Sequence, residues 1–142
     1  MLTLVETKIS MVNGLTLVAK SGSNHWVMMD TVEELGGSSA APTPFELFFM
    51  SFGGCQTMDI LSILKKMKNK VERYELVIRA HKRDEHPRIA ELIELEYRFW
   101  GELNEANVQR AIELSAEKYC SVSGMLKDEI IIKRSYRINP ED

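Results

Sequence analysis

The sequence of residues 41–68 is APTPFELFFMSFGGCQTMDILSILKKMK, and its pattern predicts one long apolar helix with a cysteine in its middle. Proline suits the first turn of a helix because its missing N–H would be unpaired there, so we expect the helix to begin at Pro44. Thr43 is the expected N-cap, and Glu46, three residues later, completes a capping box. Lysines near the other end suit the negative pole of the helix dipole.

Apolar residues fall on every side of this predicted helix, so we expect it to be buried on most of its faces. Glycines and polar residues interrupt the apolar run, and lysines follow it, which argues against a membrane span. We therefore expect a central core helix around which the rest of the chain folds.

The composition favours a single globular domain covering residues 1–142. The formal net charge is −3, which gives no electrostatic basis for binding nucleic acid. The first residues show no basic segment followed by an apolar one, so no signal peptide is expected. Neither Cys55 nor Cys120 lies in a C-x-x-C motif or has a histidine at zinc spacing. The sequence therefore predicts no metal site, no cofactor, and reduced thiols in the cytoplasm.

Three strands are expected before the helix. Residues 2–12 and 15–20 flank Asn13-Gly14, and Asn-Gly between apolar runs is the strongest short signal of a hairpin. Residues 25–30 form a short third strand. Residues 31–42 are rich in Gly, Ser, Ala and Pro, which indicates a flexible surface loop or, alternatively, a loop near the mouth of a site.

After the helix, residues 71–82 and 89–100 alternate apolar and polar side chains and predict a long hairpin. A second helix is expected over residues 105–119, with Asn104 as its N-cap, and a last strand over residues 129–138. The expected order is βββ-α-ββ-α-β. Blocks of strands separated by helices are typical of the α+β class, not of a doubly wound parallel sheet.

The central helix raises a packing problem, because the strands can cover only one of its faces. The other face, near Gly53-Gly54, needs a partner, and two glycines let another backbone approach closely. We infer a homodimer in which the central helices of the two subunits pack against each other.

The candidate catalytic residues also have simpler structural explanations. A lone core cysteine is usually a small hydrophobe, and this applies to Cys55 and to Cys120. A carboxylate at Asp59, one turn beyond Cys55, would raise the pKa of the thiol, so Asp59 better suits a cap, a pair across a dimer, or a hydrogen-bond acceptor. The capping box accounts for Glu46 without catalysis.

Two motifs in the chain resemble the OsmC/Ohr family. One is PFELFFMSFGGC at residues 44–55 followed by MDILSILKKM at residues 58–67, and the other is AIELSAEKYCSV at residues 111–122. The resemblance covers nearly the whole chain in the same order of elements. Within the family the chain resembles the YhfA-like branch, whose helix carries Gly-Gly-Cys and Met/Ile-Asp.

The resemblance implies an intertwined homodimer with strands exchanged between subunits and two active sites at the interface. It also implies a thiol peroxidase that prefers organic hydroperoxides. By this similarity Cys55 is the peroxidatic thiolate that becomes a sulfenic acid, and Cys120 resolves it as an intramolecular disulfide. A dithiol donor, such as a lipoylated protein or thioredoxin, then reduces the disulfide by exchange.

The sequence departs from the family's peroxidases in two respects. Those proteins carry a catalytic glutamate where this chain has Phe45, and Glu46 lies one residue away. They also use an arginine from the N-terminal strands, whereas this chain has no arginine before Arg73. Lys20 is the cation that we name in its place, although a lysine lacks the guanidinium fork.

Two rival functions remain open from the sequence. One is a redox-active thiol protein that uses Cys55 on another oxidant or electrophile. The other is a non-catalytic dimer that holds a small hydrophobic ligand in an apolar pocket around Phe48, Phe52 and Cys55. The missing glutamate and arginine favour the rivals, and the presence of both cysteines favours redox chemistry.

Overall fold

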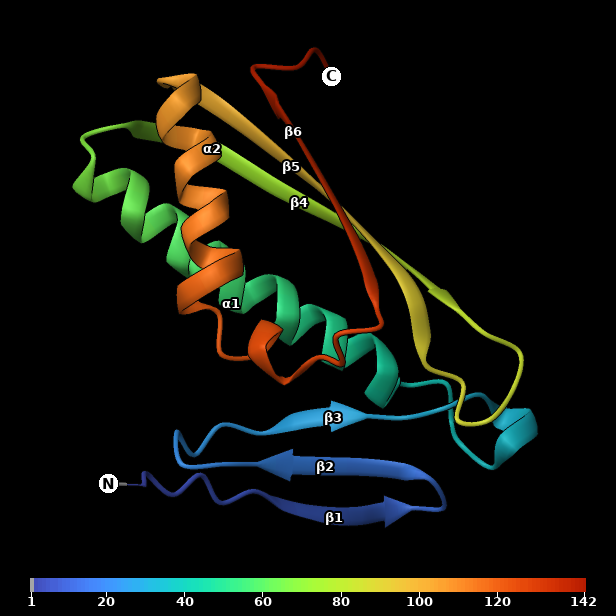
Figure 1. Cartoon of the computed structure of the whole chain (residues 1–142). Coiled ribbons are helices and arrows are strands. Elements are labelled where there is room, and N and C mark those ends of the chain that lie inside the picture. Colours follow the sequence, from blue (N-terminus) through green and yellow to red (C-terminus); the bar gives the residue numbers. More distant parts are fainter. Residues whose placement is uncertain (1) are drawn as a thin grey trace. The chain divides into compact units, whose positions relative to one another are not determined.

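The computed structural model describes residues 2–142 and divides into two compact units, residues 1–50 and 51–142 (Figure 1). The helices and strands, in chain order, are β1 (Lys8–Asn13), β2 (Thr16–Lys20), β3 (Val27–Met29), α1 (Pro44–Lys66), β4 (Lys70–Lys82), β5 (Ala90–Glu102), α2 (Glu105–Leu114) and β6 (Ile131–Ile138). Short helical turns are η1 (Glu33–Leu35), η2 (Ser115–Tyr119) and η3 (Ser123–Met125). The predicted order βββ-α-ββ-α-β and the α+β class are confirmed.

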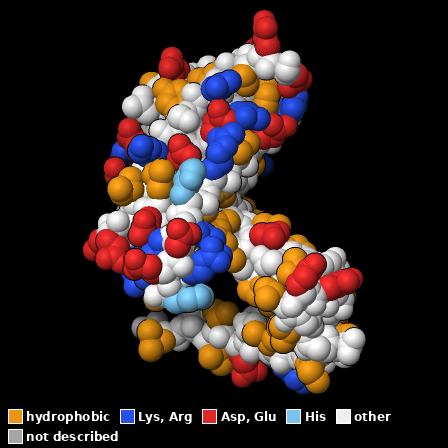
Figure 2. All heavy atoms as spheres, turned by 90° about the vertical axis from the view of Figure 1, so that its right-hand side faces the viewer, with side chains coloured by type: hydrophobic (Ala, Val, Ile, Leu, Met, Phe, Trp, Pro, Cys, Tyr) orange, Lys and Arg blue, Asp and Glu red, His pale blue; other side chains and the backbone are white. Residues whose placement is uncertain are grey.

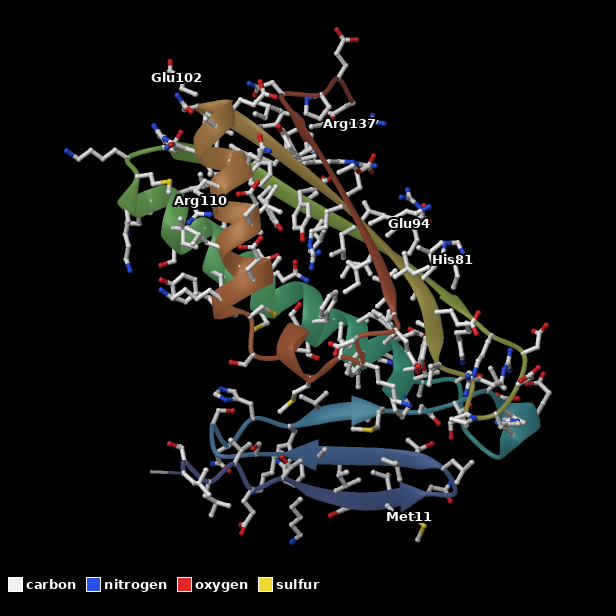
Figure 3. All side chains as sticks on the ribbon, viewed as in Figure 1. Met11, His81, Glu94, Glu102, Arg110 and Arg137 are labelled. Atoms are coloured by element: carbon white, nitrogen blue, oxygen red, sulfur yellow. The ribbon has the colours of Figure 1, made fainter. Side chains whose placement is uncertain are left out.

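The first unit holds an antiparallel sheet of order β1-β2-β3. The predicted hairpin turn at Asn13-Gly14 is present, and Gly14 has a φ of 57°, a conformation that glycine adopts without steric cost. Strand β1 begins at Lys8, later than the predicted start at residue 2. Several apolar side chains of this sheet are exposed, among them Met11, which is 73% exposed on β1 (Figure 3).

The segment predicted to be a flexible loop, residues 31–42, is organised around the carboxylate of Asp30. This side chain is 2% exposed and accepts hydrogen bonds from the backbone N–H groups of Thr31, Ser38 and Ala40 and from the hydroxyl of Thr16. Burial alone would raise the pKa of Asp30, but these four hydrogen bonds to the ionised form together lower it. The loop is therefore held by one buried charge.

Because the pKa of Asp30 is lower in the folded state, the stabilisation is present above the pKa of the unfolded carboxyl, about 3.9, and is lost as the pH falls through the folded value. The protection factors of the Ser38 and Ala40 amides, measured by NMR hydrogen exchange from neutral pH into the acid range, are expected to fall below pH ~4. In Asp30→Asn these amides should show low protection at every pH. The control Asp84→Asn should behave as the wild type, and an unchanged pH profile in Asp30→Asn would contradict this account.

The second unit holds a sheet of order β4-β5-β6, in which β4 and β5 are antiparallel and β5 and β6 are parallel. Alternate residues of β5, from Ile93 to Phe99, are buried against the helical side (Figure 1). The other face is charged: His81 and Glu94 lie next to each other there, 2.7 Å apart, and Arg137 pairs with Glu96 (Figure 3). Figure 2 shows acidic and basic side chains interspersed over part of the face that it presents. Such exposed pairs contribute at most about 1 kcal/mol each, so the apolar layer dominates stability.

Helix α1 is buried on one face only. The residues on this buried face are Phe52, Gly53, Gln56, Ile60 and Leu64. Within one chain the helix is not covered on its other sides, since Met58 is 75% exposed, and the expected cover by a second subunit stays a prediction. One sheet can cover only one side of a helical cylinder. By length and composition alone α1 is long and apolar enough to cross a membrane, a test that core helices also pass.

The two adjacent glycines of α1 differ in their surroundings. A Cβ on Gly53 would lie 2.7 Å from Cδ1 of Ile78 and 3.4 Å from Cδ2 of Leu76, both on β4. A Cβ on Gly54 would meet no atom within 4 Å. Gly53 thus lets the helix approach its own sheet, and only Gly54 is open to another partner.

Gly54→Ala is expected to raise the free energy of unfolding by roughly 0.5–1 kcal/mol, because alanine loses less backbone entropy in a helix. Gly53→Ala should be about 1 kcal/mol less stable than Gly54→Ala, because Ile78 must move to admit the methyl group. Urea unfolding of both variants at one protein concentration measures the difference. Equal stabilities would mean that Gly53 is not a site of close packing.

Candidate functional site

Two cysteines that are far apart in the sequence meet in the second unit. Cys55 lies on α1, and Cys120 directly follows the turn η2. Their Sγ atoms and a carboxylate oxygen of Asp59 all lie within 4.8 Å of one another, and both thiols are free. Cys55 and Asp59 share one face of α1 because they are one helical turn apart.

The turn η2 presents Cys120 to α1. Residues 115–119 continue α2 as a π turn, in which the N–H of Cys120 donates to the carbonyl of Ser115 at 2.9 Å. Single π turns widen a helix locally and are frequent at functional sites. The predicted helix over residues 105–119 is therefore an α-helix to Leu114 followed by this wider turn.

Cys120 is held as a neutral thiol. Burial, which leaves it 5% exposed, raises its pKa most, and the neighbouring Cys55 and Asp59 raise it further. The backbone N–H of Ser123, 3.3 Å from the Sγ atom, opposes this effect by lowering the pKa.

Asp59 accepts a hydrogen bond from the hydroxyl of Ser115 at 3.1 Å, one of the three roles expected for it. Ser115 is fully buried, and no role for it was predicted from the sequence. A serine among apolar helix positions is the signal that would have identified it, because a buried hydroxyl needs a partner.

A second buried polar group lies beside the thiols and was also missed. The hydroxyl of Tyr97 donates to Oε1 of Gln56, and both side chains are fully buried. Burial raises the pKa of Tyr97, the guanidinium of Arg134 on β6 lowers it, and Cys120 raises it. The Tyr97 hydroxyl thus interacts both with Arg134 and with Cys120. Arg134 belongs to the last strand, whereas the arginine of the family's peroxidases comes from the N-terminal strands.

Nε2 of Gln56 has no hydrogen-bond partner among the described residues. An unpaired buried amide is unusual, because the great majority of buried polar groups are hydrogen-bonded. Gln56 directly follows Cys55 on α1, so this orphan donor lies close to the site along the chain.

The remaining predicted residues have local contacts. Glu46 forms the predicted capping box, in which its N–H donates to the hydroxyl of Thr43 at 3.2 Å and its carboxylate accepts from that hydroxyl at 3.3 Å. Nζ of Lys20 donates to Asn24 at 3.2 Å and lies 4.7 Å from the centre of the Trp26 ring. Both belong to the first unit, and their part in the site stays a prediction.

An open cavity of about 440 Å³ reaches the site at Asp59. Its lining is mostly apolar with one basic side chain, and consists of Asp59, Ser62, Ile63, Lys66, Met67, Leu114 and Tyr119. Neither Phe48 nor Phe52 of the predicted pocket takes part: Phe52 is fully buried and Phe48 is 41% exposed. The cavity is large enough for a small organic molecule.

Comparison of the chain with known proteins points to one family. A family model described as OsmC-like protein matches residues 36–135. The protein YhfA of Escherichia coli K12 is 37% identical over 135 residues, which are 94% of this chain and 98% of YhfA.

Solved structures share the fold. A hypothetical protein from Aquifex aeolicus VF5 is 28% identical, with a TM-score of 0.87 over 99% of this chain and 100% of that chain. An organic hydroperoxide resistance protein OsmC from Legionella pneumophila has a TM-score of 0.70 at 17% identity, over 96% of this chain and 98% of that chain. At that identity the likeness shows the fold alone.

Proposed function

The chain belongs to the family of OsmC-like proteins, and from this premise we propose that it is a thiol peroxidase that reduces organic hydroperoxides through Cys55 and Cys120. The observation that carries the proposal is the meeting of two free thiols from distant segments beside an open cavity. The substrate class follows from the resemblance of the two cysteine motifs to the OsmC/Ohr family, and a protein of the same fold is named for organic hydroperoxide resistance.

Burial assigns different roles to the two thiols. Cys120 is 5% exposed and its pKa is raised, so it is a poor first nucleophile, since the thiolate is the reactive form. Cys55 is half-buried and is the better placed of the two to meet a peroxide. We therefore assign Cys55 as the peroxidatic cysteine and Cys120 as the resolving cysteine.

The cycle balances as follows. The Cys55 thiolate attacks the terminal oxygen of the hydroperoxide, the O–O bond breaks, and the alkoxide leaves as an alcohol after taking a proton. The sulfur of Cys120 then attacks the sulfenic acid on Cys55, a disulfide forms, and water leaves. An external dithiol, a lipoylated protein or thioredoxin, supplies two electrons and two protons to restore both thiols.

The apolar lining of the cavity fits the carbon chain of an organic hydroperoxide. Ile63, Met67 and Leu114 offer apolar contacts beside Asp59, so a peroxide with an alkyl or aryl group gains binding energy that hydrogen peroxide lacks. The exposed apolar side chains of β1 and α1 support a homodimer as the working form. The need for a dithiol reductant favours the cytoplasm as the location.

The direct test is turnover of cumene hydroperoxide and of hydrogen peroxide with a reduced lipoyl compound or with thioredoxin. We expect faster consumption of cumene hydroperoxide, and a fall to background in Cys55→Ser and in Cys120→Ser. The control Ser123→Ala keeps the backbone N–H that contacts Cys120 and should turn over as the wild type.

Consumption no faster than in Cys55→Ser would overturn the peroxidase proposal. Oxidation of Cys55 by other oxidants alone would then favour the rival redox-active thiol protein. Thiols inert to all of them would favour the ligand-binding dimer.

A further inference from the structure

We propose that the reduced protein binds one Zn²⁺ ion through Cys55, Asp59 and Cys120. The three side chains bring two sulfurs and one carboxylate oxygen within 4.8 Å of one another, from two segments that are far apart in the sequence. The inference concerns the reduced thiols and does not rest on the peroxidase cycle.

The donor set suits zinc. Thiolate sulfur and carboxylate oxygen are both common zinc ligands, and Zn–S bonds of about 2.3 Å in a tetrahedral site place ligand atoms roughly 3.8 Å apart. The present spread of at most 4.8 Å needs a contraction of about 1 Å or less, which side-chain rotation at a half-buried site can supply. Ions that prefer only oxygen ligands, such as Mg²⁺ and Ca²⁺, suit two thiols poorly.

The charges also favour a cation. The two sulfurs and the carboxylate converge on one point, and a divalent ion favours such a group because it deprotonates coordinating thiols and neutralises two of the three negative charges. The carboxylate beside the two thiols is therefore well placed for a metal.

Hydrogen bonds hold two of the three proposed ligands, as they do at known metal sites. Ser115 donates its hydroxyl to Oδ2 of Asp59 at 3.1 Å, which fixes the carboxylate and leaves Oδ1 available. The backbone N–H of Ser123 lies 3.3 Å from the Sγ atom of Cys120 and holds that sulfur in place. These partners orient two of the three ligands before any ion arrives.

The cavity at Asp59 gives the ion access and leaves a fourth position open to water or a small ligand. Three protein ligands with one open position are the arrangement of exchangeable and catalytic zinc sites, not of closed structural ones. Zn²⁺ binding and disulfide formation exclude each other, because both use the sulfur atoms of Cys55 and Cys120. Zn²⁺ is thus expected to protect both thiols from oxidation and alkylation.

The test uses Co²⁺ as a coloured probe on the fully reduced, metal-free protein under argon. We expect saturation at one equivalent per chain, with the intense near-ultraviolet absorption of Co²⁺-thiolate bonds and the visible bands of a tetrahedral site, and loss of both on adding one equivalent of Zn²⁺. Zn²⁺ affinity is then measured by competition with a chromophoric chelator.

Four variants separate the ligands from their surroundings. Cys120→Ser and Asp59→Asn should each weaken Zn²⁺ binding at least 100-fold. Ser115→Ala should weaken it roughly 10–100-fold, because it removes the hydroxyl that donates a hydrogen bond to the proposed ligand Asp59. The control Asp128→Asn, an exposed carboxylate on a nearby segment, should bind as the wild type. Asp59→Asn keeps both thiols and a side chain of nearly the same shape. It therefore still tests the Zn²⁺ site if a cysteine variant folds poorly.

The proposal fails if Co²⁺ gives no thiolate absorption, or if Asp59→Asn binds Zn²⁺ as tightly as the wild type. Both measurements exclude peroxide, so they are independent of the proposed activity. A protein that binds Zn²⁺ but does not consume hydroperoxide overturns only the peroxidase proposal, and one that turns over but does not bind Zn²⁺ overturns only this inference.

Discussion

Phe52→Ala is expected to lower the free energy of unfolding by roughly 3–5 kcal/mol, because the change removes a large apolar side chain and leaves a cavity. Phe52 is fully buried on the face of α1 that also carries Ile60 and Leu64. Such a loss is a large share of the 5–15 kcal/mol that stabilises a typical domain.

The matched control is Phe48→Ala, which makes the same substitution one helical turn earlier. Phe48 is 41% exposed, so the expected loss in this variant is about 1 kcal/mol or less. Urea denaturation of both variants at a single protein concentration measures the difference, because any contribution from association then refers to the same concentration. A loss in Phe48→Ala as large as in Phe52→Ala would contradict the burial pattern of α1.

Tyr97→Phe is expected to cost about 1–3 kcal/mol, because it leaves the buried Oε1 of Gln56 without its donor. Gln56→Leu alone should cost a similar amount by removing the acceptor of the Tyr97 hydroxyl. The double variant should lie within about 1 kcal/mol of the wild type, since it replaces both partners by apolar groups and also removes the unpaired Nε2 of Gln56.

A double-mutant cycle by urea unfolding measures this coupling. Additive losses in the double variant would show that Tyr97 and Gln56 do not act as a pair. The variant Asn104→Ala, which removes the side-chain oxygen that accepts from the N–H of Asn107 at the start of α2, serves as the control and should add independently to Tyr97→Phe.

The fold was largely predictable because its signals are local. The capping box at Thr43 and Glu46, the Asn13-Gly14 turn and the alternation along β5 each act within a few residues, and each appears as predicted. The errors concern tertiary effects. The covered fraction of α1 depends on the sheet, and the start of β1 depends on the available partner residues of β2.

The loop over residues 31–42 shows what composition alone misses. Its glycines and serines indicate flexibility, but the carboxylate of Asp30 gathers three of its backbone N–H groups. An aspartate directly before a Gly- and Ser-rich segment is a signal for such a turn, because its side chain can bond nearby backbone groups.

The site was predictable only as two separate residues. The resemblance to the OsmC/Ohr family named Cys55 and Cys120, but no spacing rule connects residues so far apart, and the structure supplies their meeting. The role of Lys20 stays a prediction, and the sequence did not single out Arg134, which lies beside the Tyr97 hydroxyl. Its place on the last strand beside β5 could be known only from the parallel pairing of β6.

The most direct test of the proposed function is the intact mass of the purified protein without reductant, after stoichiometric cumene hydroperoxide. We predict rapid loss of two hydrogen atoms in the wild type, and in Cys120→Ser a sulfenic acid on Cys55 that a dimedone adduct traps. Thiols that remain reduced for hours, or an oxidised Cys55 that never forms a disulfide with Cys120, would contradict the two-cysteine mechanism.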